Sequence, residues 1–98
     1  MKNILIIGKN SFIAKNFIND FKNRINIFYF NKIFKIDKKT LYEKYLEKNI
    51  KKNKINIILN FAANNDNSFG GNFSKILESN FYLPLSILKI SNKFQITL

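Results

Sequence analysis

The chain begins with a short apolar run that ends at a glycine. Residues 3–7 read Asn-Ile-Leu-Ile-Ile, and Gly8 follows directly. A continuous apolar run of this length, rich in β-branched residues, is typical of a strand that is buried on both faces. Such strands occur mainly in parallel sheets that carry helices on both sides. The run therefore predicts that the chain opens with a strand of a parallel sheet.

Strand and helix patterns alternate along the rest of the chain. Further strands are expected at residues 25–30 and 55–61, and helices at residues 12–22, 40–50 and 73–91. The last residues, 94–98, begin to alternate as a fourth strand would. This order predicts one α/β domain over residues 1–98, in which a parallel sheet of about four strands is flanked by helices.

The helical segments carry three finer expectations. Thr40 and Glu43 have the spacing of a capping box, in which Thr40 would begin the second helix. Pro84 lies inside the third helical pattern and should kink it or separate two helical pieces. Phe12 and Ile13 are expected to belong to the core.

Composition excludes several kinds of site and of protein. The chain has neither Cys nor His, so disulfides, thiolate metal sites and imidazole bases are excluded, and no metal site is expected. No apolar run approaches the roughly 20 residues of a membrane span. Four apolar residues before Gly8 are also too few for a secretory signal. We expect a cytoplasmic protein that does not span a membrane.

The net charge is strongly positive, because 17 Lys and Arg stand against 6 Asp and Glu, giving +11. This balance keeps a basic nucleic-acid-binding protein as an alternative, since lysines neutralise phosphates. Two features disfavour it: Arg24 is the single arginine, and the lysines are spread along the chain. Their densest cluster, residues 48–54, falls where a helix should end. The bias toward Lys, Asn, Ile and Phe is typical of an AT-rich genome.

The turn after the first strand has the spacing of a phosphate-binding turn. Small residues lie three and six positions after Gly8, at Ser11 and Ala14. In dinucleotide-binding folds these positions allow a tight turn, backbone approach to a pyrophosphate and close packing of helix on sheet. Taken alone, the same residues equally describe an ordinary strand–turn–helix.

Four segments together resemble one family. Gly8-Lys-Asn-Ser-Phe-Ile-Ala14 is similar to the Gly-x-x-Gly-[Phe/Tyr]-[Ile/Leu]-Gly opening of the extended short-chain dehydrogenases/reductases. These are nucleotide-sugar epimerases, dehydratases and reductases. Asp37 stands where that family keeps an adenine-binding Asp, and Asn60-Phe61-Ala62-Ala63 resembles its Asn/His-x-Ala-Ala segment. Asn80, with Pro84 four residues on, resembles the central helix of dTDP-4-dehydrorhamnose reductase-like members.

The resemblance covers nearly the whole chain and implies a partial NAD(P)-binding, Rossmann-like domain, truncated after about four strands. Asn31 and Lys32 follow the expected second strand, where NAD-preferring proteins place a carboxylate for the ribose. A lysine would instead attract a 2′-phosphate, so NADP is favoured over NAD. The cofactor-binding residues are expected to be Gly8, Asn10, Ser11, Phe12, Ile13, Asn31, Lys32, Asp37, Phe61, Ala62, Ala63 and Asn80. Asp37 could equally be a solvated loop acid.

The family's catalytic Tyr-x-x-x-Lys pair is missing. The tyrosines are Tyr29, Tyr42, Tyr45 and Tyr82, and none is followed by Lys four residues later. In the family this pair lies beyond the fourth strand, inside which the chain ends. We therefore assign no catalytic residue and expect the chain alone to be inactive, with a nucleotide-sugar substrate only in a longer form. A non-enzymatic nucleotide-binding or regulatory Rossmann module is the alternative.

An incomplete sheet should also affect association. In the family the first strand normally pairs with the fourth, so we expect a partial fourth strand to leave the edge of the first strand exposed. Unpaired strand edges are templates for pairing with another chain. The sequence thus predicts self-association through an exposed sheet edge.

Overall fold

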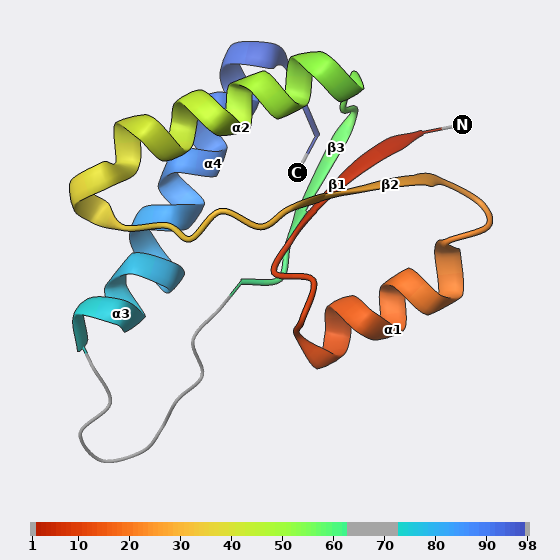
Figure 1. Cartoon of the computed structure of the whole chain (residues 1–98), viewed down its shortest axis with the longest axis horizontal. Helices are drawn as coiled ribbons and strands as arrows, with labels where there is room; N and C mark the ends of the chain where they lie inside the picture. Colours follow the sequence, from red (N-terminus) through yellow and green to blue (C-terminus); the bar gives the residue numbers. More distant parts are fainter. Residues whose placement is uncertain (1, 63–72, 98) are drawn as a thin grey trace.

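The computed structural model describes residues 2–62 and 73–97 (Figure 1). Its strands are β1 (Asn3–Ile7), β2 (Asn26–Phe30) and β3 (Ile57–Asn60), and they form one parallel sheet in the order β2-β1-β3. The predicted α/β class with a parallel sheet is confirmed, and the described sheet has three strands. This arrangement is compatible with a Rossmann-like fold.

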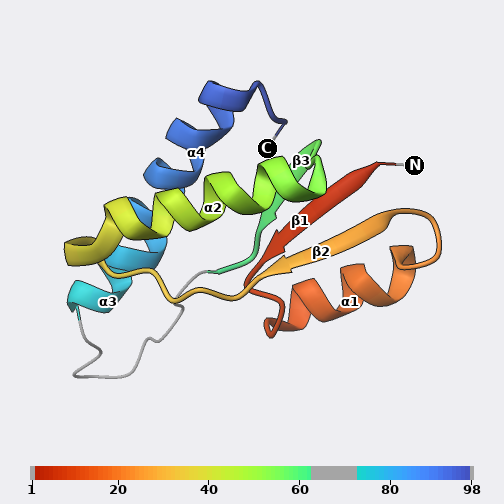
Figure 2. The same cartoon turned by 45° about the horizontal axis from the view of Figure 1, so that its top comes forward.

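Helices cover both faces of the sheet. They are α1 (Phe12–Phe21), α2 (Lys39–Asn53), α3 (Phe73–Leu77) and α4 (Leu83–Phe94), with a 3-10 turn at Ile36–Lys38 and a π-helical segment at Glu78–Tyr82. Figures 1 and 2 show α2 and α4 on one face and α1 on the other. In the described part of the chain no helix is long and apolar enough to cross a membrane.

Strand β1 lies at the centre of the sheet. Ile4 pairs with Ile27 of β2 on one side and with Ile57 of β3 on the other. The expectation that the first strand has an exposed edge is therefore wrong, because the crossover through α2 returns the chain to the free side of β1. The sheet edges belong to β2 and β3 instead.

The expected strand at 94–98 is largely replaced by helix, since α4 continues to Phe94. Thr97 then forms one isolated parallel bridge with Ile57. The backbone N–H of Ile58 donates to the Thr97 carbonyl at 3.0 Å, and the Thr97 N–H donates to the Asn56 carbonyl at 3.2 Å. Within the described residues, this bridge is the pairing along the outer edge of β3.

The main core lies between the sheet and the helices α2 and α4. Leu5 and Ile7 of β1, Leu46 of α2 and Ile87 of α4 belong to one buried cluster. The opposite residues of β1, Ile4 and Ile6, are also buried. Burial of both faces of β1 confirms what its continuous apolar run predicts.

The first turn of α1 differs from the expectation. Phe12 is 80% exposed and Ile13 is 67% exposed, so their assignment to the core is wrong. The buried residue of α1 is Ala14, whose small side chain lets the helix approach the sheet. Phe12 and Ile13 come directly after the turn that leaves the end of β1, where no described element covers them.

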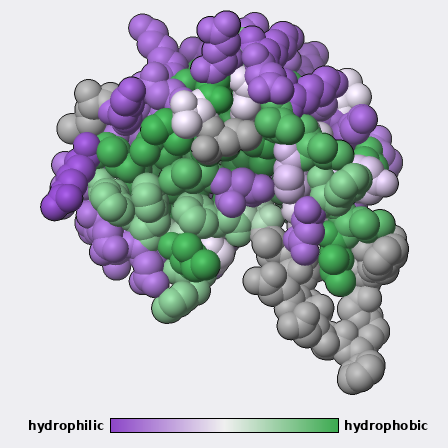
Figure 3. Space-filling model, turned by 180° about the vertical axis from the view of Figure 1, so that it is seen from behind, coloured by the Kyte–Doolittle hydropathy of each residue, from purple (hydrophilic) through white to green (hydrophobic). Residues whose placement is uncertain are grey.

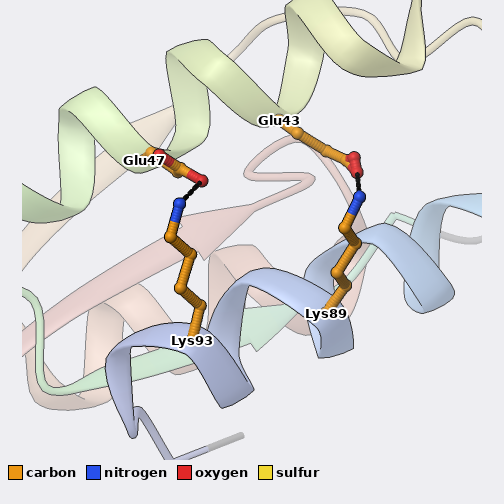
Figure 4. A network of polar contacts seen from close by, with 4 residues as sticks. All are labelled: Glu43, Glu47, Lys89 and Lys93. Carbon is orange, nitrogen blue, oxygen red and sulfur yellow. Dashed lines mark hydrogen bonds and ion pairs between the residues drawn. The ribbon is translucent and has the colours of Figure 1, made fainter.

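The predicted capping box of α2 is also wrong. A 3-10 turn precedes this helix, which begins at Lys39, and no side chain caps its first turn. Glu43 is instead buried toward α4, where its carboxylate pairs with Lys89 at 3.1 Å. One turn later Glu47 pairs with Lys93 at 2.9 Å, so two parallel ion pairs join the helices (Figure 4).

Pro84 separates two helical pieces, as expected. It occupies the first turn of α4, where its missing N–H costs no helical hydrogen bond. The π-helical segment Glu78–Tyr82 lies between α3 and α4. Such segments are local widenings of a helix and are often found at functional sites.

Tyr42 provides a test of the core. Its ring meets Phe30 and Phe34 edge-on at centroid distances of 5.1 Å each, and its buried hydroxyl has no hydrogen-bond partner among the described residues. Tyr42→Phe should therefore raise the free energy of unfolding by about 1 kcal/mol, measured by urea denaturation. The control Tyr45→Phe, at a half-exposed ring, should change it by less than about 0.5 kcal/mol. A clear loss of stability in Tyr42→Phe would contradict this description.

Candidate functional site

A cavity of about 1090 Å³ opens at the carboxyl ends of the three strands. The turn after β1, the segment 31–37 after β2, the residues after β3 and the region around Glu78 surround it. Eight of the predicted cofactor-binding residues line it, namely Gly8, Asn10, Ser11, Asn31, Lys32, Asp37, Phe61 and Ala62. The fold thus gathers residues that lie far apart in the sequence.

Topology explains why the cavity lies here. The chain passes from β1 to β2 through α1 on one face of the sheet, and from β2 to β3 through α2 on the other face. The connections therefore diverge between β1 and β3. In open α/β sheets, a crevice at such a point is the usual ligand-binding position.

Gly8 allows the ends of β1 and β3 to approach closely. Its φ angle is +82°, a conformation that side chains strongly disfavour. A Cβ at this position would lie 2.6 Å from the Ala62 backbone nitrogen and 2.7 Å from the Phe61 carbonyl carbon. Both the turn and the contact with β3 therefore require glycine.

Ser11 ends this turn and begins α1. Its N–H donates to the Gly8 carbonyl at 3.2 Å, and its Oγ accepts from the Ala14 N–H at 3.1 Å. Ser11 is thus the N-cap of a helix whose positive end lies beside the cavity. The turn depends on Gly8, the helix cap is Ser11, and the close contact of α1 with the sheet depends on Ala14.

The cavity wall carries more positive than negative charge. Its charged residues are Lys9, Lys32, Lys35, Lys75, Asp37 and Glu78. The Lys32 ammonium lies 4.6 Å from the centroid of the Tyr45 ring, and that of Lys9 lies 5.4 Å from the Tyr29 ring. Four cationic groups facing two carboxylates favour an anionic ligand.

Sequence reasoning missed three of these lysines and Glu78. Lys9 lies inside the predicted turn, so its position beside Gly8 could have indicated it. Lys35, Lys75 and Glu78 have no local signal, because only the tertiary fold brings them to the cavity. Glu78 connects two parts of the wall: its Oε2 accepts from the Ile36 N–H at 2.9 Å.

Four predicted residues are not placed on the wall. Phe12 and Ile13 are exposed on the first turn of α1 and do not line the cavity. Asn80 is exposed in the π-helical segment and also does not line it. Ala63 lies outside the described residues.

A smaller cavity of about 540 Å³ adjoins the first along the end of β2. The two share Phe30, Asn31 and Lys32. Lys48 and Lys52 of α2 line the smaller cavity opposite this strand end. Lys32 therefore lies between a larger cavity and a second group of lysines.

The chain matches no known protein-family profile and no curated protein. The interpretation of the cavity therefore depends on its residues. The wall combines a glycine turn at a helix N-terminus, apolar side chains such as Phe34 and Phe61, and an excess of lysines. Backbone N–H groups and lysines bind phosphates, and aromatic rings contact planar bases. The arrangement is suited to binding a nucleotide.

Replacing Gly8 tests the turn. Gly8→Ala should lower the free energy of unfolding by more than about 1–2 kcal/mol, because a left-handed backbone and a clash with Ala62 act together. The neighbouring control Lys9→Ala should change it by less than about 0.5 kcal/mol. Equal free energies of unfolding for Gly8→Ala and Lys9→Ala in urea denaturation would contradict the close approach of the two strand ends.

Replacing Glu78 tests the link across the cavity. Glu78→Ala removes the acceptor of the Ile36 N–H and should increase hydrogen exchange at that amide about tenfold, which corresponds to about 1.4 kcal/mol of lost protection. Glu47→Ala, which removes an ion pair distant from this segment, is the control. Unchanged exchange at Ile36 in Glu78→Ala would show that this contact does not hold the segment.

Proposed function

We propose that the chain binds NAD(P) as the N-terminal segment of an extended short-chain dehydrogenase/reductase that acts on a nucleotide-sugar. The observation that carries the proposal is the cavity at the carboxyl edge of the parallel sheet, where Gly8, Ser11, Lys32 and Asp37 meet. These residues come from two separate segments of the chain, the turn after β1 and the segment after β2. A dinucleotide has two phosphates between two nucleosides, so its site needs residues from separate segments at one edge of the sheet.

Each part of the cofactor has candidate residues. The backbone of the Gly8–Ser11 turn and the N-terminus of α1 would hold the pyrophosphate. The segment 31–37, with Asp37, would hold the adenosine. Phe61 and Ala62, at the end of β3, would lie beneath the cofactor. When bound, NAD(P) would supply hydride transfer.

The charges favour NADP over NAD. Lys32 is the second residue after β2, at a position where a carboxylate would repel a 2′-phosphate. The smaller cavity adds Lys48 and Lys52 on the other side of Lys32. A ligand with a phosphate in this region would therefore meet several ammonium groups.

The described residues support cofactor binding rather than acid–base catalysis. Tyr42 lines the cavity, but burial raises the pKa of its phenol well above the ordinary value, so it keeps its proton. The residue four positions after it is Leu46, not Lys. We therefore propose that the residues from Met1 to Leu98 bind the cofactor, and that acid–base catalysis and the nucleotide-sugar require further residues.

Calorimetric titration with NADP and NAD tests this proposal. We expect both to bind, NADP more tightly. Lys32→Ala should weaken NADP binding about tenfold, or about 1.4 kcal/mol, and leave NAD binding nearly unchanged. The control is Lys44→Ala on α2, because Lys44 is exposed and lines neither cavity.

Two outcomes would count against the proposal. No heat at millimolar concentrations of either cofactor from folded protein would argue against the site itself. An equal effect of Lys32→Ala on NADP and NAD would argue against the position assigned to the 2′-phosphate.

A further inference from the structure

The smaller cavity, of about 540 Å³, lies between the end of β2 and helix α2. Its wall consists of lysines, aromatic residues and asparagines, and none of the described residues that line it is acidic. They are Tyr29, Phe30, Asn31, Lys32, Tyr45, Lys48, Asn49 and Lys52. Tyr45 and Asn49 are four residues apart, as are Lys48 and Lys52, so α2 presents one side to the cavity. The fold thus brings lysines from two distant segments to one hollow.

The lysines of this cavity are not neutralised by carboxylates. Among residues 2–62 and 73–97, no ion pair involves Lys32, Lys48 or Lys52. Helix α2 does carry acidic residues, but Glu43 and Glu47 pair with lysines of α4 on another side of the helix (Figure 4). The side of α2 that faces the cavity therefore keeps its positive charge, which attracts anions.

Two tyrosine rings of the wall are accessible and have an ammonium group beside them. Tyr29 is 41% exposed and Tyr45 is 39% exposed. The ammonium of Lys9 lies 5.4 Å from the centroid of the first ring, and that of Lys32 lies 4.6 Å from the centroid of the second. A nucleic-acid strand carries one base and one phosphate per nucleotide. Aromatic rings stack on bases of any sequence, and ammonium groups bind phosphates, so each pair can hold both parts.

The fold answers the two features that disfavour nucleic acid in the sequence. Lysines that are spread along the chain gather here, because Lys48 and Lys52 lie within α2 and meet Lys32 across the cavity. The scarcity of arginine matters for reading base edges in a duplex. A single strand bound through phosphate charge and base stacking does not need such contacts.

The far side of the molecule has a different character. Helix α4 lies behind α2 in Figure 1, so the view from behind in Figure 3 looks onto the side of α4. There, hydrophobic residues form a continuous band across the middle, bordered by hydrophilic residues. A polyanion finds little charge on such a band, which favours the cavity beside α2 as its binding surface.

We propose that the smaller cavity is a binding site for single-stranded RNA. The lysines would hold the phosphates, and the rings of Tyr29 and Tyr45 would stack on bases. The side-chain amides of Asn31 and Asn49 both donate and accept hydrogen bonds, so they suit the ribose 2′-hydroxyl that distinguishes RNA from DNA. This proposal does not depend on cofactor binding, because Tyr45, Lys48 and Asn49 do not line the larger cavity.

Fluorescence anisotropy with a labelled oligouridine of about 12 nucleotides tests the phosphate contacts. Three lysines should make the logarithm of the binding constant fall with that of the salt concentration with a slope of about −2, since each phosphate contact in a single strand contributes about 0.7. Lys48→Ala should make this slope shallower by about 0.7. Lys15→Ala removes the same charge from an exposed position on α1, across the sheet from α2, and should leave the slope unchanged.

Replacing a ring tests the stacking. Tyr45→Ser should weaken RNA binding about tenfold, whereas Tyr45→Phe keeps the ring and should bind nearly as the wild type does. Tyr82→Ser is the control, because Tyr82 is 36% exposed and does not line the cavity. Circular dichroism establishes that each variant is folded.

Four results would overturn the proposal. The first is the absence of binding to oligouridine at millimolar concentration and low salt. The second is an equal salt slope in Lys48→Ala and Lys15→Ala, or an equal loss of affinity in Tyr45→Ser and Tyr82→Ser. The third is equal affinity for oligodeoxyuridine of the same length, which would remove the role of the 2′-hydroxyl. The fourth is binding to vesicles of phosphatidylcholine and phosphatidylserine but not to RNA, which would make an anionic membrane the partner.

Discussion

The structure depends on the complete burial of one strand. Strand β1 is paired on both edges, with β2 and with β3, and its residues Ile4 to Ile7 are buried on both faces. Burial of four consecutive large aliphatic side chains removes the water that would otherwise compete for the backbone hydrogen bonds. The layer of α1 below and the layer of α2 and α4 above are both positioned against this strand.

The candidate site follows from the way this strand ends. Gly8 turns away from β1 so closely to β3 that a Cβ has no room beside Ala62. The same turn starts α1 at its Ser11 cap and directs the positive end of that helix toward the cavity. Lysines from the ends of β1 and β2 and from α3 then surround the opening. One backbone constraint thus supports both the sheet and the proposed phosphate position.

Local patterns in the sequence predicted where strands, turns and helices form. They did not predict what packs against individual side chains. The runs at 3–7 and 55–61 and the small residues Gly8, Ser11 and Ala14 are short-range signals, and the structure places strands, a turn and a cap there. Exposure of Phe12 depends on what lies over the first turn of α1, which no local pattern contains. Likewise, Glu43 has capping-box spacing but pairs with Lys89, 46 residues away.

The most direct test of the account is to observe which backbone amides respond to the cofactor. In a heteronuclear NMR titration of the labelled chain with NADP, we expect the largest shifts at Gly8–Ser11, at Asn31 and Lys32, and at Phe61 and Ala62. These residues lie at the ends of three strands and meet only at the cavity. Shifts scattered over exposed lysines, or no shifts at millimolar NADP, would contradict a dinucleotide site at this edge of the sheet.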